Sequence, residues 1–105
     1  MTKTIRSLMV LAVVALASAV CFAQSAGEAT YTAKCKMCHG ATGTPNAMMA
    51  KSMGIKAVSD PDIQKLTADQ MFASVKNGKG KMQPFAGKLS DAEIKDAVAF
   101  YKGLK

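Results

Sequence analysis

Two thiols and an imidazole fall within five consecutive residues, Cys35-Lys36-Met37-Cys38-His39. Two cysteines separated by two residues and followed directly by histidine form the attachment pattern for a c-type haem. The chemistry explains the spacing, because the two thiols can add to the two vinyl groups on one side of the porphyrin. The imidazole of the histidine then lies beneath the iron as an axial ligand. The motif therefore predicts one covalent haem on Cys35 and Cys38, with its iron bound by His39.

Three other kinds of site also use paired cysteines. A structural zinc site needs four ligands, usually in two separated pairs, and the chain contains one further cysteine, Cys21, and no second histidine. A thioredoxin-like redox pair follows a strand of a βαβ unit, and the sequence predicts no strand. A disulfide is compatible with an oxidising compartment, but it would leave His39 without a role. Haem attachment accounts for all three side chains.

Helices and loops are expected to position these groups, so the predicted fold class is all-α. A first helix is predicted over residues 27–36, with Tyr31 and Cys35 four residues apart on one face. A short helix is possible within residues 46–54. Two later helices have capping boxes, in which side chains satisfy free backbone N–H groups. The two boxes are Thr67-Ala68-Asp69-Gln70 and Ser90-Asp91-Ala92-Glu93.

The first 23 residues have the pattern of a secretory signal peptide. Lys3 and Arg6 form a basic start, an apolar run covers residues 8–20, and small residues precede a cleavage site after Ala23. As a helix, the apolar run would span about 20 Å, which is short of the roughly 30 Å hydrocarbon core of a membrane. We therefore expect a cleaved leader (residues 1–23), a single mature domain (residues 24–105) and a periplasmic location.

The predicted mature chain is small and basic. It has 82 residues and no tryptophan, and domains of this size often need a covalent or metal staple. Its twelve basic and seven acidic residues give a net charge of +5, and it contains no arginine. We expect acidic partners, because a positive net charge attracts them. We expect no nucleic acid partner and no membrane span. The lysines nearest the motif and Met82 are Lys34, Lys36, Lys79, Lys81 and Lys88.

The segments around the motif resemble class I cytochromes c. The pattern Gly27-x-x-x-Tyr31-x-x-x-Cys35-x-x-Cys38-His39-Gly40 is similar to the N-terminal helix and attachment site of that family. The segment Gly78-Lys79-Gly80-Lys81-Met82 and the closing helix are similar to its C-terminal half. The resemblance covers essentially all of residues 24–105 and is nearest to small bacterial single-haem proteins of the c-551 and c6 kind. It implies the class I cytochrome c fold, with three to five helices wrapped around one covalent haem.

The resemblance also implies roles for residues outside the motif. The family places its axial methionine in a loop just before the last helix, which makes Met82 the expected second ligand of the iron. The carbonyl of Pro45 is expected to accept a hydrogen bond from the far nitrogen of His39 and so to raise the basicity of the ring. Gly27 and Tyr31 are expected to pack the first helix across the last one.

These assignments favour an electron carrier over an enzyme. A thioether and an imidazole fill both axial positions of the iron, which leaves no position for a substrate. We expect a monomer that exchanges single electrons with acidic-surfaced redox proteins, whether soluble or membrane-bound. One alternative is a haem subunit of a larger oxidoreductase complex. Another is a peroxidase-like or ligand-sensing protein, which would need an open iron position and polar distal groups that the sequence does not supply.

Overall fold

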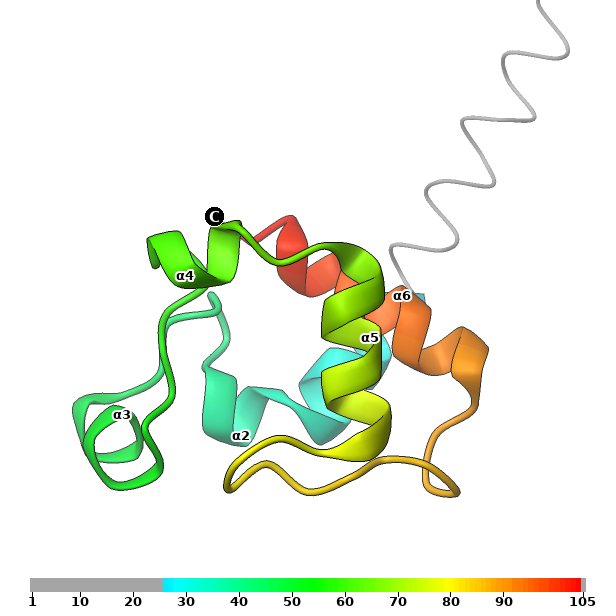
Figure 1. Ribbon diagram of the computed structural model, residues 1–105, viewed down its shortest axis with the longest axis horizontal. Coiled ribbons are helices and arrows are strands. Elements are labelled where there is room, and N and C mark those ends of the chain that lie inside the picture. The colour runs from blue at the N-terminus through cyan, green and yellow to red at the C-terminus, as the bar shows by residue number, and fades with distance from the viewer. Residues whose placement is uncertain (1–25, 105) are drawn as a thin grey trace, which may run out of the picture.

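The computed structural model describes residues 26–104, so the predicted signal peptide lies outside the described residues. Helices joined by loops make up this part of the chain, which contains no strand beyond two isolated backbone bridges (Figure 1). Residues 26–34 are helical. In order, the later helices are α2 (Lys36–His39), α3 (Ala47–Met53), α4 (Pro61–Gln64), α5 (Ala68–Asn77) and α6 (Asp91–Lys102). Within residues 26–104, no helix has the length and apolar character needed to cross a membrane.

Both predicted capping boxes are present and begin the two longest labelled helices. At the start of α5, the Gln70 N–H donates to Thr67 Oγ1 at 3.1 Å and the Thr67 N–H donates to Gln70 Oε1 at 2.9 Å. At the start of α6, the Glu93 N–H donates to Ser90 Oγ at 3.1 Å and the Ser90 N–H donates to Glu93 Oε1 at 3.0 Å. These reciprocal bonds satisfy backbone donors that a helix leaves free in its first turn.

The main apolar core lies between α5 and α6. Ile94 is fully buried, and Met71 and Val98 are 7% and 5% exposed. Spacings of three and four residues place these side chains on one face of each helix. Partly buried residues from α4, α5, α6 and the loops surround the cluster: Ile63, Leu66, Phe72, Val75, Phe85, Leu89 and Tyr101.

The first helix crosses the last one at a glycine, as expected. A Cβ placed on Gly27 would lie 2.3 Å from the Asp96 carbonyl oxygen, so only glycine permits this approach. One turn later, the buried Tyr31 ring lies 5.3 Å from the Phe100 ring and 6.0 Å from the Tyr101 ring, measured between centroids. This crossing fixes the helix that leads into the cysteine motif against the end of α6.

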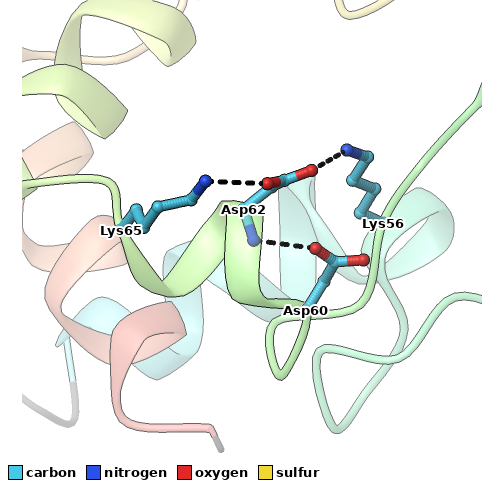
Figure 2. A network of polar contacts seen from close by, with 4 residues as sticks. All are labelled: Lys56, Asp60, Asp62 and Lys65. Carbon is cyan, nitrogen blue, oxygen red and sulfur yellow. Dashed lines mark hydrogen bonds and ion pairs between the residues drawn. The ribbon is translucent and has the colours of Figure 1, made fainter.

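The helices that precede α5 from the motif onward contain no buried residue. This holds for α2, α3 and α4, of which α3 and α4 begin at side-chain caps. Asn46 caps α3 by accepting from the Met49 N–H at 2.8 Å. Asp60 caps α4 by accepting from the Asp62 N–H at 2.8 Å (Figure 2).

The second residue of α4, Asp62, is the centre of an exposed ion-pair network. Its carboxylate lies 2.6 Å from Lys56 Nζ and 3.0 Å from Lys65 Nζ (Figure 2). The hydrogen bond from Lys56 lowers the pKa of Asp62, and the bond from Lys65 lowers it further. The network joins the segment before α4 to the residue that follows the helix.

Candidate functional site

The cysteine motif directly follows the first helix and forms the short helix α2, with Cys35 at its N-cap. The Cys35 N–H donates to the Tyr31 carbonyl at 2.8 Å, and the His39 N–H donates to the Cys35 carbonyl at 2.9 Å. Helical winding gives the motif a solvent side and an inner side. Met37 is 88% exposed, whereas both cysteines and His39 are partly buried. The three side chains with ligand chemistry therefore lie together on the more protected side.

Both thiols are free, so the structure does not support a disulfide. Burial raises the pKa of the Cys35 thiol, and the neighbouring Cys38 raises it further. Both effects favour the protonated thiol over the thiolate. Among the described residues, no group of three or more His, Cys, Asp and Glu side chains is placed to hold a metal ion.

The imidazole of His39 is partly buried and packs against an aromatic ring. Burial lowers the pKa of His39, and the neutral ring is the form that binds a metal. The Tyr101 ring lies edge-on to it, with 5.5 Å between centroids. His39 Nδ1 is buried and has no hydrogen-bond partner among residues 26–104, so the bond expected to the Pro45 carbonyl is not formed in this structure. The ring is oriented here by packing against Tyr101 instead.

The loop after His39 folds tightly back on itself. Gly40 has a φ of 84°, and a Cβ at this position would lie 2.1 Å from the Thr44 carbonyl oxygen. The hydroxyl of Tyr31 donates to the Gly40 carbonyl at 2.7 Å. The Val58 N–H donates to the Gly43 carbonyl at 2.9 Å. These contacts fix the chain on the C-terminal side of the imidazole.

Two residues with a part in that loop were not anticipated from the sequence. The ring of Tyr31 was expected to pack on the last helix, but its hydroxyl gave no separate signal. Val58 is 2% exposed and lies against Gly43, yet it occurs in a segment without helical or strand periodicity. Its role depends on a contact between distant parts of the chain, which a local pattern does not show.

Burial divides the methionines of residues 26–104 into three groups. Met71 belongs to the α5–α6 core. Met37 and Met48 are 88% and 78% exposed, which makes them poor candidates for an enclosed iron ligand. The remaining methionines are half-buried: Met49, Met53 and Met82.

Met82 lies at the end of a tight turn after α5. Lys79 and Met82 exchange two backbone hydrogen bonds, of 3.2 Å and 3.0 Å, around Gly80, whose φ is 58°. Further along, the Phe85 N–H donates to the Val75 carbonyl at 2.9 Å, which returns the loop to α5. The loop is thus ordered by backbone bonds, as a segment that presents a ligand needs to be.

The donor set fits a covalently attached haem. Two unpaired thiols lie three residues apart on one helical turn, followed directly by an imidazole whose pKa is lowered by burial. The buried Nδ1 of His39 has a proton or a lone pair to satisfy, whereas the other ring nitrogen can serve as the metal ligand. This combination is the chemistry that haem attachment and axial ligation require.

Comparisons with known proteins agree with this chemistry. Residues 22–100 match a sequence model of the family described as "Cytochrome C oxidase, cbb3-type, subunit III". The chain is 42% identical over 84 residues to cytochrome c-555 of Chlorobaculum thiosulfatiphilum, covering 75% of this chain and 93% of the relative. It is 33% identical over 75 residues to cytochrome c6 of Gracilaria tenuistipitata var. liui, covering 71% and 67% of the two chains.

A solved structure has the same architecture. The KustC0563 c-type cytochrome matches with a TM-score of 0.68 and 30% identity, over 75% of this chain and 96% of that one. This match confirms the expected all-α class I fold. Proteins of this kind bind haem c covalently and carry electrons, so they are not enzymes. The fold, the motif and these relatives show that the chain belongs to the cytochrome c family, among its small single-haem class I members.

Proposed function

We propose that residues 24–105 form a periplasmic one-electron carrier whose single haem is attached through Cys35 and Cys38. The observation that carries this proposal is the pair of free thiols on one helical turn, directly followed by a partly buried imidazole. When bound, haem iron supplies reversible one-electron redox chemistry. The polypeptide supplies the anchor and the axial ligands, and it shields the iron from water.

The proposed axial ligands are His39 and Met82. A thioether stabilises ferrous iron and so raises the reduction potential, as suits a carrier. Two filled axial positions also disfavour binding of oxygen or peroxide. The carbonyl of Pro45 is the proposed acceptor for His39 Nδ1.

Mass spectrometry of cysteine variants tests the attachment. The protein is purified from the envelope of a host with working haem-attachment machinery and is then denatured. The wild type is expected to retain one haem per chain after denaturation. Cys35→Ala and Cys38→Ala should each yield chains with at most one thioether bond, and the double variant should yield none. A double variant that keeps haem after denaturation would contradict attachment at these residues.

The charge distribution supports acidic partners. Residues 29–59 and 70–90 contain no Asp or Glu, and they include both the motif and the Met82 loop. Two lysines of these stretches, Lys56 and Lys76, form ion pairs with Asp62 and Asp91. The lysines of the same stretches that form no ion pair within residues 26–104 are Lys34, Lys36, Lys51, Lys79, Lys81 and Lys88. We propose that they form the docking surface for acidic redox proteins.

Small oxidants of opposite charge test this surface. Oxidation of the reduced protein by ferricyanide, an anion, should slow as salt rises, while oxidation by a cationic cobalt(III) complex should accelerate. Lys36→Glu should reduce the ferricyanide rate at low salt about two- to tenfold. Lys65→Glu is the matched control, because it changes the same charge at the α4 network. Equal effects of the two variants would contradict a docking surface near the motif.

A second candidate function is that of a haem subunit in a larger oxidoreductase complex. It is favoured by the description of the matched family, which names a subunit of an oxidase. Sedimentation of envelope extracts at native expression level separates the two possibilities. We expect the protein to sediment as a monomer. We also expect its N-terminal residue to be Gln24, as the proposed signal cleavage requires. Sedimentation of most of the protein with a large membrane complex would favour the subunit.

A further inference from the structure

One side-chain contact connects the Met82 loop to a distant helix. Lys81 Nζ donates to the Ser52 carbonyl at 2.6 Å, across 29 positions of sequence. Ser52 lies in the last turn of α3, where carbonyls have no intrahelical donor and the helix dipole is negative. An ammonium group is therefore well suited to this position, although both groups are exposed.

The contact lies in the part of the loop that makes no backbone hydrogen bond to a helix. Backbone bonds from Phe85 to Val75 and from Ala86 to Lys76 tie the later part of the loop to α5. Within residues 26–104, the turn that carries Met82 makes backbone hydrogen bonds only within itself, between Lys79 and Met82. The side chain of Lys81 therefore connects the turn that carries Met82 to α3.

We propose that Lys81 is a positioning residue, which holds Met82 in place by fastening its turn to the end of α3. This inference rests on the proposed role of Met82 as the iron ligand. Because Lys81 and Met82 are adjacent in one closed turn, movement of the turn away from α3 would displace both residues together. Removal of the contact should make opening of the loop easier without affecting the α5–α6 core.

Imidazole binding to the oxidised holoprotein measures this opening directly. Added imidazole can bind the iron only when the axial methionine leaves, so its apparent affinity includes the equilibrium for loop opening. Loss of one hydrogen bond of ordinary net strength should raise the imidazole affinity of Lys81→Ala about two- to tenfold. Lys81→Arg, which keeps a cationic donor, should restore most of the wild-type affinity.

Lys79→Ala is the matched control. Lys79 lies in the same turn and carries the same charge, so its removal reproduces the electrostatic change but not the loss of the tie. Its imidazole affinity should stay within twofold of the wild type. Amide hydrogen exchange at residues 79–82 should accelerate in Lys81→Ala and should not change in Lys79→Ala. Equal imidazole affinities of Lys81→Ala and Lys79→Ala would overturn the proposal.

The far-red sulfur-to-iron absorption band separates failure of this inference from failure of the proposed ligand. If the band persists in Met82→Leu, another methionine binds the iron, and the role of Lys81 falls with that of Met82. If the band is lost in Met82→Leu but Lys81→Ala behaves like the wild type, Met82 remains the ligand and only the positioning role is wrong.

Discussion

The α5–α6 half and the α2–α4 half of this cytochrome are stabilised in different ways. Helices α5 and α6 bury Met71, Ile94 and Val98 against one another and begin at reciprocal capping boxes. Helices α2, α3 and α4 bury no residue; α3 and α4 each have one side-chain cap and α4 adds ion pairs, whereas α2 has no side-chain cap. Burial of apolar side chains is the dominant stabilising term in folding. We therefore expect α5–α6 to be stabilised by its own core and α2–α4 to depend on the anchored haem.

Removal of haem attachment should have the largest effect. In the double variant Cys35→Ala, Cys38→Ala, we expect loss of cooperative tertiary structure, because domains of about this size rarely fold stably without a staple. Amide exchange should show almost no protection in residues 36–64 and residual protection in α5 and α6. Near-wild-type thermal unfolding of the variant would contradict the division into two halves.

A cavity in the α5–α6 core should have the next largest effect. Ile94 is fully buried, so Ile94→Ala should lower the free energy of unfolding by about 2–5 kcal/mol, measured in denaturant. Met48, in α3, is 78% exposed, so Met48→Ala should stay within about 0.5 kcal/mol of the wild type. Comparable losses in the two variants would show that α3 contributes to a core as much as α6 does.

Removal of helix caps tests the same comparison, with a smaller expected loss of stability. Ser90→Ala breaks the capping box of α6 and should destabilise the holoprotein by about 1 kcal/mol. Asn46→Ala removes the cap of α3, which packs no buried residue, so we expect faster local exchange in α3 with a smaller change in global stability. Both quantities can be read from one hydrogen-exchange experiment. A larger loss of global stability in Asn46→Ala than in Ser90→Ala would contradict the view that α6 contributes more to the core than α3.

The smallest effect should come from the α4 ion pairs. The pKa of Asp62 is lowered in the folded state by Lys56 and then Lys65, so the stabilisation is present above the unfolded pKa of about 3.9. It is lost as pH falls through the lower folded pKa. Asp62→Asn should therefore reduce stability at pH 7 slightly and flatten its decline below about pH 4. High salt should weaken the effect, because all three groups are exposed.

Local signals predicted the well-packed half of this fold accurately. The capping boxes at Thr67 and Ser90 identified α5 and α6, because each box lies within one helical turn. The glycine at position 27 was also interpreted correctly, since close helix approach requires a missing side chain. The motif at Cys35 predicted the haem chemistry because covalent attachment constrains spacing along the chain.

Contacts between distant segments could not be predicted in the same way. The tie from Lys81 to Ser52, the hydrogen bond from Tyr31 to Gly40 and the burial of Val58 each join parts of the chain without a shared local pattern. The expected bond from His39 to Pro45 is absent in this structure, since it depends on the exact path of an irregular loop. Such loops are positioned by tertiary packing, which spacing alone does not determine.

The absorption spectrum of the holoprotein, recorded for the wild type and Met82→Leu, tests the central claim most directly. The account predicts a low-spin c-type spectrum with a weak far-red band in the oxidised wild type and loss of that band in the variant. Colourless wild-type protein from a competent host, or a band that survives in Met82→Leu, would contradict an iron held between His39 and Met82.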